Sequence, residues 1–160
     1  MIFVTLGTQD KSFHRLLMKL DELIEKDVIQ SDIIVQAGNT KYKSKNMKIL
    51  NFINMSEFNH YVADCEYLIT HAGVGSIMNG LDHQKKVIAV ARRVQYGEHE
   101  NDHQVEITNK FAELQYIIGC CEVCELEENL KKLHTFQTKP YTSNNQSFCQ
   151  RISGLIDMER

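Results

Sequence analysis

The sequence is poor in the features that mark membrane-spanning, disulfide-bonded or nucleic-acid-binding proteins. No apolar run approaches the roughly 18–20 residues that a membrane-spanning helix needs. The five cysteines are an odd number, which argues against a complete set of disulfide bonds. The net charge is −3, so no global basic field attracts nucleic acid or an anionic membrane. Motif absences exclude further classes, because the chain has no Walker lysine motif, zinc signature or nucleophile elbow.

The remaining composition suits one packed domain. Hydrophobic residues make up 42% of the 160 residues, enough for a single core, and we expect one domain over residues 1–160. The first six residues lack the basic region and cleavage site of a signal peptide and are typical of a first strand. We therefore expect a cytoplasmic protein with reduced thiols. The C-x-x-C at residues 121–124 has no second ligand pair at zinc-finger spacing, so no metal site is expected there.

Short apolar runs alternate with segments of helical periodicity along the chain. We expect strands at residues 2–6, 32–36, 47–52, 66–70, 86–91 and 115–118. We expect helices at residues 12–26, 56–63, 74–82, 100–111 and 126–133. Residues 135–147 are polar, hold the only proline and form a predicted crossover, and residues 148–158 form a predicted closing helix.

This alternation predicts an α/β fold, namely a Rossmann-like parallel sheet with helices on both faces. Ser12 is the expected cap of the first helix. Ligands of such sheets bind outside the carboxyl ends of the strands. The loops that follow the strands are therefore where function is expected.

The most informative loop follows the strand predicted at residues 66–70. It contains His71, Gly73 and Gly75, and a helix is predicted to begin at once. Such a turn brings backbone N–H groups and the positive end of a helix dipole to one point, where anions bind. Glycines let a ligand approach the main chain, so a nucleotide diphosphate fits this junction. The alternative is an ordinary connection between a strand and a helix.

Two further loops carry polar groups that suit a nucleotide sugar. Gly7, Thr8 and Gln9 follow the first strand and can hold phosphate oxygens, although a plain turn explains them equally well. They do not form a dinucleotide fingerprint, because Gly73 and Gly75 stand in a later turn than G-x-G-x-x-G requires.

Asn101, His103 and Gln104 stand at the start of the helix predicted at residues 100–111. Their side chains offer both donors and acceptors to sugar hydroxyls, or they cap a surface helix. His71 is a candidate for phosphate contact or proton transfer, or a structural residue.

One segment departs from the acidic balance of the chain. Four lysines, Lys41, Lys43, Lys45 and Lys48, stand close together. They form either a solvated loop or a patch that faces a membrane or a partner.

These motifs together resemble the donor-binding half of GT-B glycosyltransferases. The resemblance lies in residues 49–64, in His71-Ala-Gly73-Val-Gly75-Ser76, and in Asn101-Asp-His103-Gln104 with Glu106. The chain is similar to the family 28 C-terminal domain and most similar to small subunits made of that half alone. Such subunits serve the eukaryotic two-part UDP-GlcNAc transferase of dolichol-linked oligosaccharides and bacterial capsule and exopolysaccharide synthesis. Residues 3–8 and the total length fit this group.

The resemblance implies a role for each matching residue. Phe52 and Ile53 would meet the uracil, and Asn79 stands where the family usually has a Glu that grips the ribose. Because a charge-assisted hydrogen bond is roughly twice as strong as a neutral one, we expect weaker nucleotide affinity or an altered donor preference. The donor sugar would face Asn101, His103 and Gln104. The expected diphosphate-binding residues are Gly7, Thr8, Gln9, His71, Gly73, Gly75 and Ser76.

The resemblance also implies a function. We expect a metal-independent, inverting hexosyltransferase without a cofactor, which transfers sugar from a UDP-sugar to a lipid-linked acceptor in surface polysaccharide synthesis. His71 is its candidate catalytic residue. The acceptor half would come from a separate membrane-anchored subunit, which would hold this chain at the inner face of the membrane. Helix 148–158 would either dock on that partner or close this domain's own core. The alternative function is a non-catalytic subunit that stimulates a partner glycosyltransferase.

Overall fold

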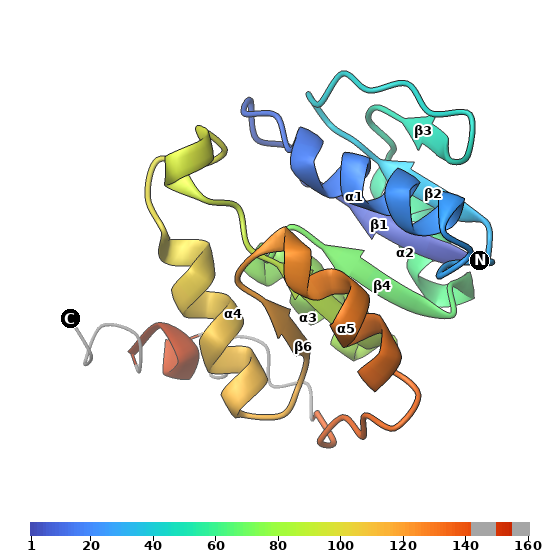
Figure 1. Cartoon of the computed structure of the whole chain (residues 1–160). Coiled ribbons are helices and arrows are strands. Elements are labelled where there is room, and N and C mark those ends of the chain that lie inside the picture. Colours follow the sequence, from blue (N-terminus) through green and yellow to red (C-terminus); the bar gives the residue numbers. More distant parts are fainter. Residues whose placement is uncertain (142–149, 155–160) are drawn as a thin grey trace.

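The computed structural model describes residues 1–141 and 150–154, which form a six-stranded sheet covered by helices (Figure 1). The strand order is β3-β2-β1-β4-β5-β6, and every neighbouring pair is parallel. The strands are β1 (Ile2–Thr5), β2 (Ile33–Gln36), β3 (Lys48–Leu50), β4 (Tyr67–Thr70), β5 (Lys86–Val90) and β6 (Ile118–Cys120). The predicted Rossmann-like parallel sheet is confirmed.

Helices cover both faces of this sheet. They are α1 (His14–Glu25), α2 (Met55–Asp64), α3 (Val74–Asp82), α4 (His103–Glu113) and α5 (Leu126–Lys132), with short 3₁₀ turns η1 (Val94–Tyr96) and η2 (Val123–Glu125). One core lies under α1 and α5, and a second lies under α2, α3 and α4. Strand β1 serves both, because Val4 faces the first core and Phe3 the second, as alternation along a strand requires. None of the helices in the described ranges is long and apolar enough to cross a bilayer.

The predicted starts of two helices differ from the observed ones, because capping and turn contacts determine where a helix begins. Helix α1 begins at His14, and Thr40 Oγ1 accepts the hydrogen bond from the Phe13 N–H (3.0 Å), so Ser12 is not the cap. Helix α4 begins at His103 instead of residue 100.

The last strand was predicted at residues 115–118, and this prediction is wrong. Helix α4 runs on to Glu113, and Gln115 has a left-handed backbone (φ 60°) that ends it. The strand therefore forms later, at Ile118–Cys120, where it pairs with β5.

The cysteines and the chain end complete the comparison. Cys65 and Cys120 are buried, and all four cysteines of the described ranges are free thiols. Residues 150–154 are helical, and Ile152 (3% exposed) joins the second core. The rest of helix 148–158 and residues 142–147 of the crossover lie outside the described residues.

Candidate functional site

A cavity of about 430 Å³ opens at the carboxyl ends of β1, β2 and β4. It brings together all ten residues that were predicted to bind UDP, although these belong to three separate loops and to helix α3. Four further residues, Thr5, Gln36, Met55 and Phe58, complete its wall. The predicted residues that line it are Gly7, Thr8, Gln9, Phe52, Ile53, His71, Gly73, Gly75, Ser76 and Asn79.

The turn between β4 and α3 bares its backbone to this cavity. Ala72 adopts a left-handed conformation (φ 64°), which folds the chain sharply before the helix. Helix α3 then begins at Val74, and its N-cap residue Gly73 has no side chain to cap it, so N–H groups of the first turn remain available to a ligand. A Cβ added at Gly75 would have no heavy atom within 4 Å, so the space over this residue is open. The turn thus presents the accessible main chain of a helix N-terminus, a geometry that can bind an anion.

His71 fills the space between the two glycine loops. Its imidazole would lie 2.6 Å from a Cβ at Gly7 and 2.4 Å from a Cβ at Gly73, so both positions require glycine. Gly7 additionally has a φ of 73°, a conformation that glycine adopts at no steric cost. The position of the His71 imidazole therefore explains why residues 7 and 73 are glycines.

The ring of His71 is held in one orientation by strand β1. Its Nδ1 lies 3.3 Å from the carbonyl oxygen of Thr5, to which it donates, so Nε2 carries the free lone pair. Burial, helped by the nearby Arg92 cation, lowers the pKa of His71 to about 4. At neutral pH the imidazole is therefore uncharged and can accept a proton at Nε2.

A side-chain bridge from Gln36 ties the loops of the cavity together. Its Oε1 accepts from Thr5 Oγ1 (2.6 Å), and its Nε2 donates to the carbonyl oxygens of Gly7 (3.0 Å) and Asn51 (3.2 Å). The bridge fixes the loop after β1 against the segment that leads to Phe52. Sequence reasoning missed Gln36; the available signal was a buried amide at the carboxyl end of a predicted central strand.

The opposite wall of the cavity is apolar. Phe52 is 57% exposed and Met55 68% exposed, and Ile53 and Phe58 lie beside them in the lining. Exposed aromatic and aliphatic surface next to free backbone groups suits a planar heterocycle. A reciprocal capping box between Asn54 and Glu57 fixes the start of α2 below this wall.

Asn79 reaches the cavity from the second turn of α3. Its Nδ2 donates to Asn59 Oδ1 (2.9 Å). Its own Oδ1 is buried and has no hydrogen-bond partner among the described residues. A buried acceptor without a donor is costly, and a ligand hydroxyl could satisfy it after a small rotation of the amide.

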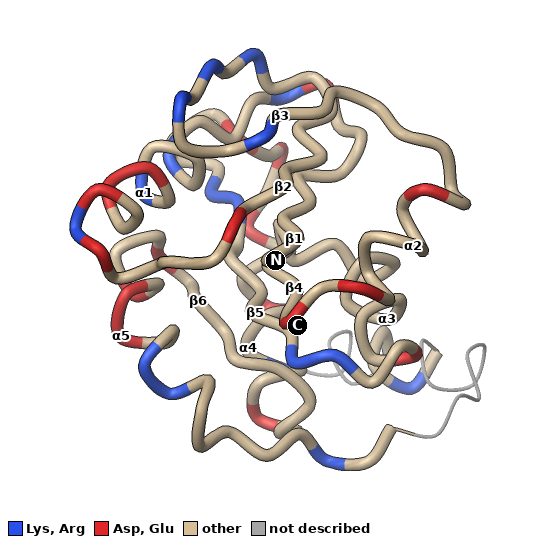
Figure 2. The backbone as a smooth tube through the Cα atoms, turned by 90° about the vertical axis from the view of Figure 1, so that its right-hand side faces the viewer, with Lys and Arg blue, Asp and Glu red and all other residues tan. Residues whose placement is uncertain are grey.

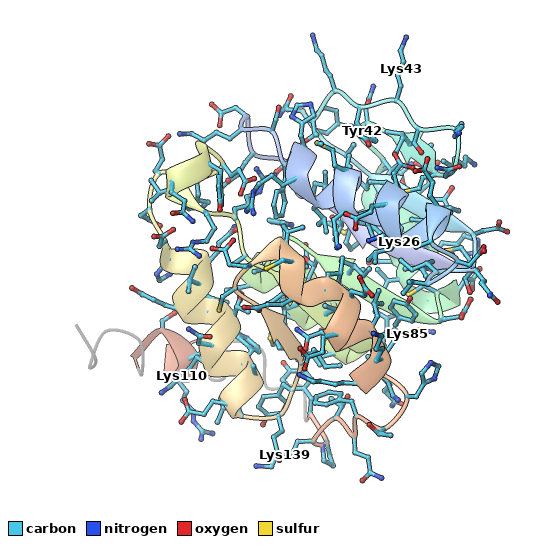
Figure 3. The ribbon with its side chains drawn as sticks, viewed as in Figure 1. Lys26, Tyr42, Lys43, Lys85, Lys110 and Lys139 are labelled. Carbon is cyan, nitrogen blue, oxygen red and sulfur yellow. The ribbon has the colours of Figure 1, made fainter. Side chains whose placement is uncertain are left out.

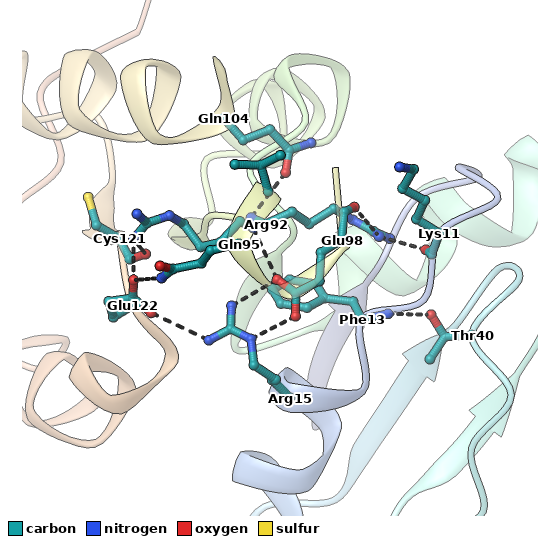
Figure 4. Close-up of polar contacts among 12 residues, drawn as sticks. Lys11, Phe13, Arg15, Thr40, Arg92, Gln95, Glu98, Gln104, Cys121 and Glu122 are labelled. Carbon is teal, nitrogen blue, oxygen red and sulfur yellow. Dashed lines mark hydrogen bonds and ion pairs between the residues drawn. The ribbon is translucent and has the colours of Figure 1, made fainter. Parts of the chain in front are cut away.

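The three residues predicted to face the sugar do not line this cavity. Gln104 is 5% exposed and its Oε1 accepts from the Arg92 N–H (3.2 Å), so its side chain supports the loop after β5 (Figure 4). Asn101 Oδ1 accepts from the His103 N–H (3.0 Å) as a local cap. The His103 ring lies 3.3 Å from Glu106 on the surface. The structure favours the capping interpretation for Asn101.

Arg92 is the largest fully buried side chain of the molecule. Its guanidinium donates to the carbonyl oxygens of Leu6 (2.7 Å), Lys11 (2.6 Å) and Glu98 (3.2 Å), and it lies over the Phe13 ring. Burial lowers its pKa to about 10. Arg92 thereby clamps both ends of the loop that carries Gly7, Thr8 and Gln9.

Glu98 forms the second half of this clamp. Its carboxylate is almost fully buried and accepts two hydrogen bonds from Arg15 of α1, at 2.7 and 2.8 Å, and one from the Arg93 N–H. The Arg15 guanidinium also stacks over the Tyr96 ring, 3.8 Å from its centroid. The loops after β1 and β5 are therefore joined by buried charged groups (Figure 4).

Comparison with known proteins agrees with this geometry. The glycosyltransferase family 28 C-terminal domain matches residues 1–157. The UDP-N-acetylglucosamine transferase subunit ALG13 of Candida albicans is 26% identical over 122 residues, which are 76% of this chain and 38% of that protein. The same subunit of Saccharomyces cerevisiae is 30% identical over 105 residues, which are 64% of this chain and 50% of that protein.

A solution NMR structure of ALG13 superposes with a TM-score of 0.62 at 22% identity, covering 98% of this chain and 96% of that one. The chain spans half or less of the length of the curated relatives that it matches. Since the family match extends over nearly all of the sequence, this chain belongs to the glycosyltransferase family 28 C-terminal domain family.

Proposed function

We propose that the chain is the donor-binding, catalytic subunit of a two-part glycosyltransferase that uses a UDP-sugar. The observation that supports it is that the uncapped N-terminus of α3, the two glycine loops and an apolar wall all line the same cavity. Its volume, about 430 Å³, lies in the range of small-molecule sites. ALG13 is named a UDP-N-acetylglucosamine transferase subunit, so UDP-N-acetylglucosamine is the first donor to test.

In this proposal the two ends of the nucleotide meet different chemistry. The diphosphate lies over Gly73, Gly75 and Ser76, where N–H groups and the helix dipole stabilise the charge that builds on the leaving UDP. The uracil lies against Phe52 and Ile53. No metal or cofactor is assigned to the reaction, because neutral donors serve the leaving group.

The acceptor hydroxyl needs a base that this cavity does not supply. Among its described lining residues there is no Asp or Glu, and the one histidine, His71, has a pKa lowered to about 4 and is therefore a weak base. Its Nε2 lies between Gly7 and Gly73, where it can donate to a phosphate oxygen if the bound diphosphate raises its pKa and it takes up a proton. We therefore assign His71 to the diphosphate and the catalytic base to a partner.

That partner is proposed to be a membrane-anchored subunit with the acceptor half of the fold. It would present a lipid-linked saccharide at the inner face of the membrane, in surface polysaccharide synthesis such as capsule or exopolysaccharide formation. The word "subunit" in the names of the relatives supports an assembly of this kind.

The second candidate is a non-catalytic stimulatory subunit. It is favoured by the missing base and by the inward position of Gln104, which leaves the sugar side of the cavity without the predicted contacts. Titration calorimetry with UDP separates the two. An enhancer has no need of UDP and would give no heat at millimolar nucleotide with the fold intact.

Gly75→Val sharpens this test. A Cβ at this position meets no heavy atom within 4 Å, and the valine side chain would occupy the diphosphate space, so UDP affinity should fall by at least about a hundredfold while the thermal midpoint stays nearly unchanged. Gly154→Val is the matched control, because Gly154 is also an exposed helical glycine with open space around it and lies outside the cavity lining. Equal UDP affinity in both variants would reject the assigned diphosphate site.

A further inference from the structure

The segment between β2 and β3 is held in place by side-chain hydrogen bonds, although it contains no regular secondary structure. Asp21 of α1 accepts hydrogen bonds from three of its side chains: Tyr42 (2.7 Å), Ser44 (2.6 Å) and Asn46 (3.0 Å). Ser44 Oγ in turn accepts from two backbone N–H groups, those of residues 46 and 47. One carboxylate thus organises the whole segment.

This anchoring points the alternate residues outward. Tyr42, Ser44 and Asn46 are half-buried, whereas the lysines between and around them are exposed. Of the four lysines in and next to this segment, only Lys45 has a carboxylate within 4.0 Å among the described residues. That carboxylate belongs to Glu25, and the pair is largely exposed. Figure 2 shows the blue positions gathered along the loop above β3, and Figure 3 shows Lys43 directed away from the body of the protein. The exposed lysines are Lys41, Lys43, Lys45 and Lys48.

An exposed apolar side chain lies on the same side of the molecule. His14 contacts the Lys41 carbonyl (2.9 Å) and Asp21 contacts the segment about two helical turns later, so this stripe of α1 faces the loop. Met18 lies between them on the same stripe and is 60% exposed. We call Met18 and the four exposed lysines the lysine face.

The lysine face begins at the rim of the cavity. Asn39, just before it, donates to the carbonyl oxygens of Thr8 (3.3 Å) and Gln9 (3.0 Å) in the loop that lines the cavity. A flat surface bound by the lysine face would therefore lie close to the cavity.

We propose that the lysine face binds the anionic headgroups of a lipid bilayer directly and holds the cavity at the membrane surface. Flexible ammonium groups suit a layer of mobile phosphates, whereas recognition of one fixed phosphate favours arginine. Met18 adds apolar surface that can enter the headgroup region. The benefit to catalysis rests on the proposed function, because a lipid-linked acceptor is found only at the bilayer. The binding itself needs no nucleotide.

Cosedimentation of the full chain with vesicles tests the proposal. We expect binding to vesicles of phosphatidylcholine and phosphatidylglycerol in equal parts, and none to phosphatidylcholine alone. Replacing Lys41, Lys43 and Lys45 by Gln should weaken binding roughly a hundredfold, at about fivefold for each lysine. The control replaces Lys131, Lys132 and Lys139 by Gln, three exposed lysines elsewhere on the surface, and should keep most of the binding. Figure 3 shows Lys139 far from Lys43.

Two single variants test the details. Met18→Ser should weaken binding by roughly fivefold, and Glu25→Gln should strengthen it, because the change removes the negative charge beside Lys45. Equal losses in the two triple variants would overturn the proposal. Absence of binding to the vesicles that contain phosphatidylglycerol would also overturn it and would indicate that the lysines face an acidic protein.

Calorimetry with UDP on the same variants keeps the two proposals apart. The Lys41/Lys43/Lys45 variant should bind UDP as the natural chain does. UDP binding without vesicle binding rejects only the lysine face, and vesicle binding without UDP binding rejects only the proposed function.

Discussion

The loops after β4 and β5 follow neighbouring strands at the carboxyl end of the sheet, yet they use their polar groups in opposite ways. The first leaves the backbone N–H groups of Val74 and Gly75 without internal partners in the described ranges and opens onto a cavity. The second, around Arg92 and Glu98, directs charged side chains inward, where nearly every polar atom finds a partner within the protein. The comparison teaches that the loop after β4, unlike the loop after β5, keeps hydrogen-bonding capacity that a ligand can use.

Arg92→Met is expected to have the largest effect, because it removes donors from three buried carbonyl oxygens and the cation near Glu98. We expect the free energy of unfolding to fall by about 3 kcal/mol in urea denaturation. UDP affinity should also fall, since the loop with Gly7 and Thr8 loses its clamp. Arg151→Met, at an exposed position, is the control. A loss below about 1 kcal/mol would show that the buried charge is dispensable.

His71 should make stability depend on pH. Its pKa is lowered from 6.5 to about 4 in the folded chain, so between these values the unfolded chain binds a proton that the folded chain does not. Stability is therefore unaffected above about pH 6.5, falls as the pH drops below it, and levels off near pH 4. The expected loss between pH 7 and pH 5 is about 2 kcal/mol.

His71→Gln should remove this slope, whereas His60→Gln, at an exposed position, should keep it. Calorimetry adds a second readout. If His71 Nε2 contacts the diphosphate, UDP binding should take up a proton near pH 6 in the natural chain and not in His71→Gln. Identical pH profiles in the two variants would remove His71 from this role.

Gln104→Ala distinguishes the two interpretations of the loop after β5. The structure predicts that it leaves the Arg92 N–H unpaired and lowers the free energy of unfolding by about 1–2 kcal/mol, with UDP affinity unchanged. The sequence prediction of a sugar contact requires instead that UDP-sugar affinity falls relative to UDP. Gln95→Ala, an exposed amide of the same loop, serves as the control for urea denaturation and calorimetry.

The sheet and the cavity could be predicted from the sequence because the patterns that indicate them are local. Each buried strand is an apolar run, and the turn at residues 71–76 combines glycines with a strand end and a helix start. The strand predicted at residues 115–118 failed because the left-handed Gln115 leaves no mark in an apolar pattern.

The clamp of Arg92 and Glu98 could not be predicted from the sequence, for a related reason. Arg92 reaches the Leu6 carbonyl 86 positions away, and Arg15 reaches Glu98 across 83. A pattern of residue types identifies polar side chains in a loop but not whether they turn inward. The same limit explains Gln104, whose position at a helix start suggested an exposed contact.

Asn79→Glu is expected to have the smallest effect and refines the binding loop. A carboxylate can accept from ribose hydroxyls more strongly than the neutral Oδ1, so UDP affinity should rise by about three- to tenfold. Asn79→Gln is the control, because it has the length of Glu without the charge. The gain should vanish for 2′,3′-dideoxyuridine diphosphate if the new bond goes to the ribose hydroxyls. A gain that persists with the dideoxynucleotide, or one that Asn79→Gln reproduces, would place the effect in the amide pair with Asn59 instead of in the ligand.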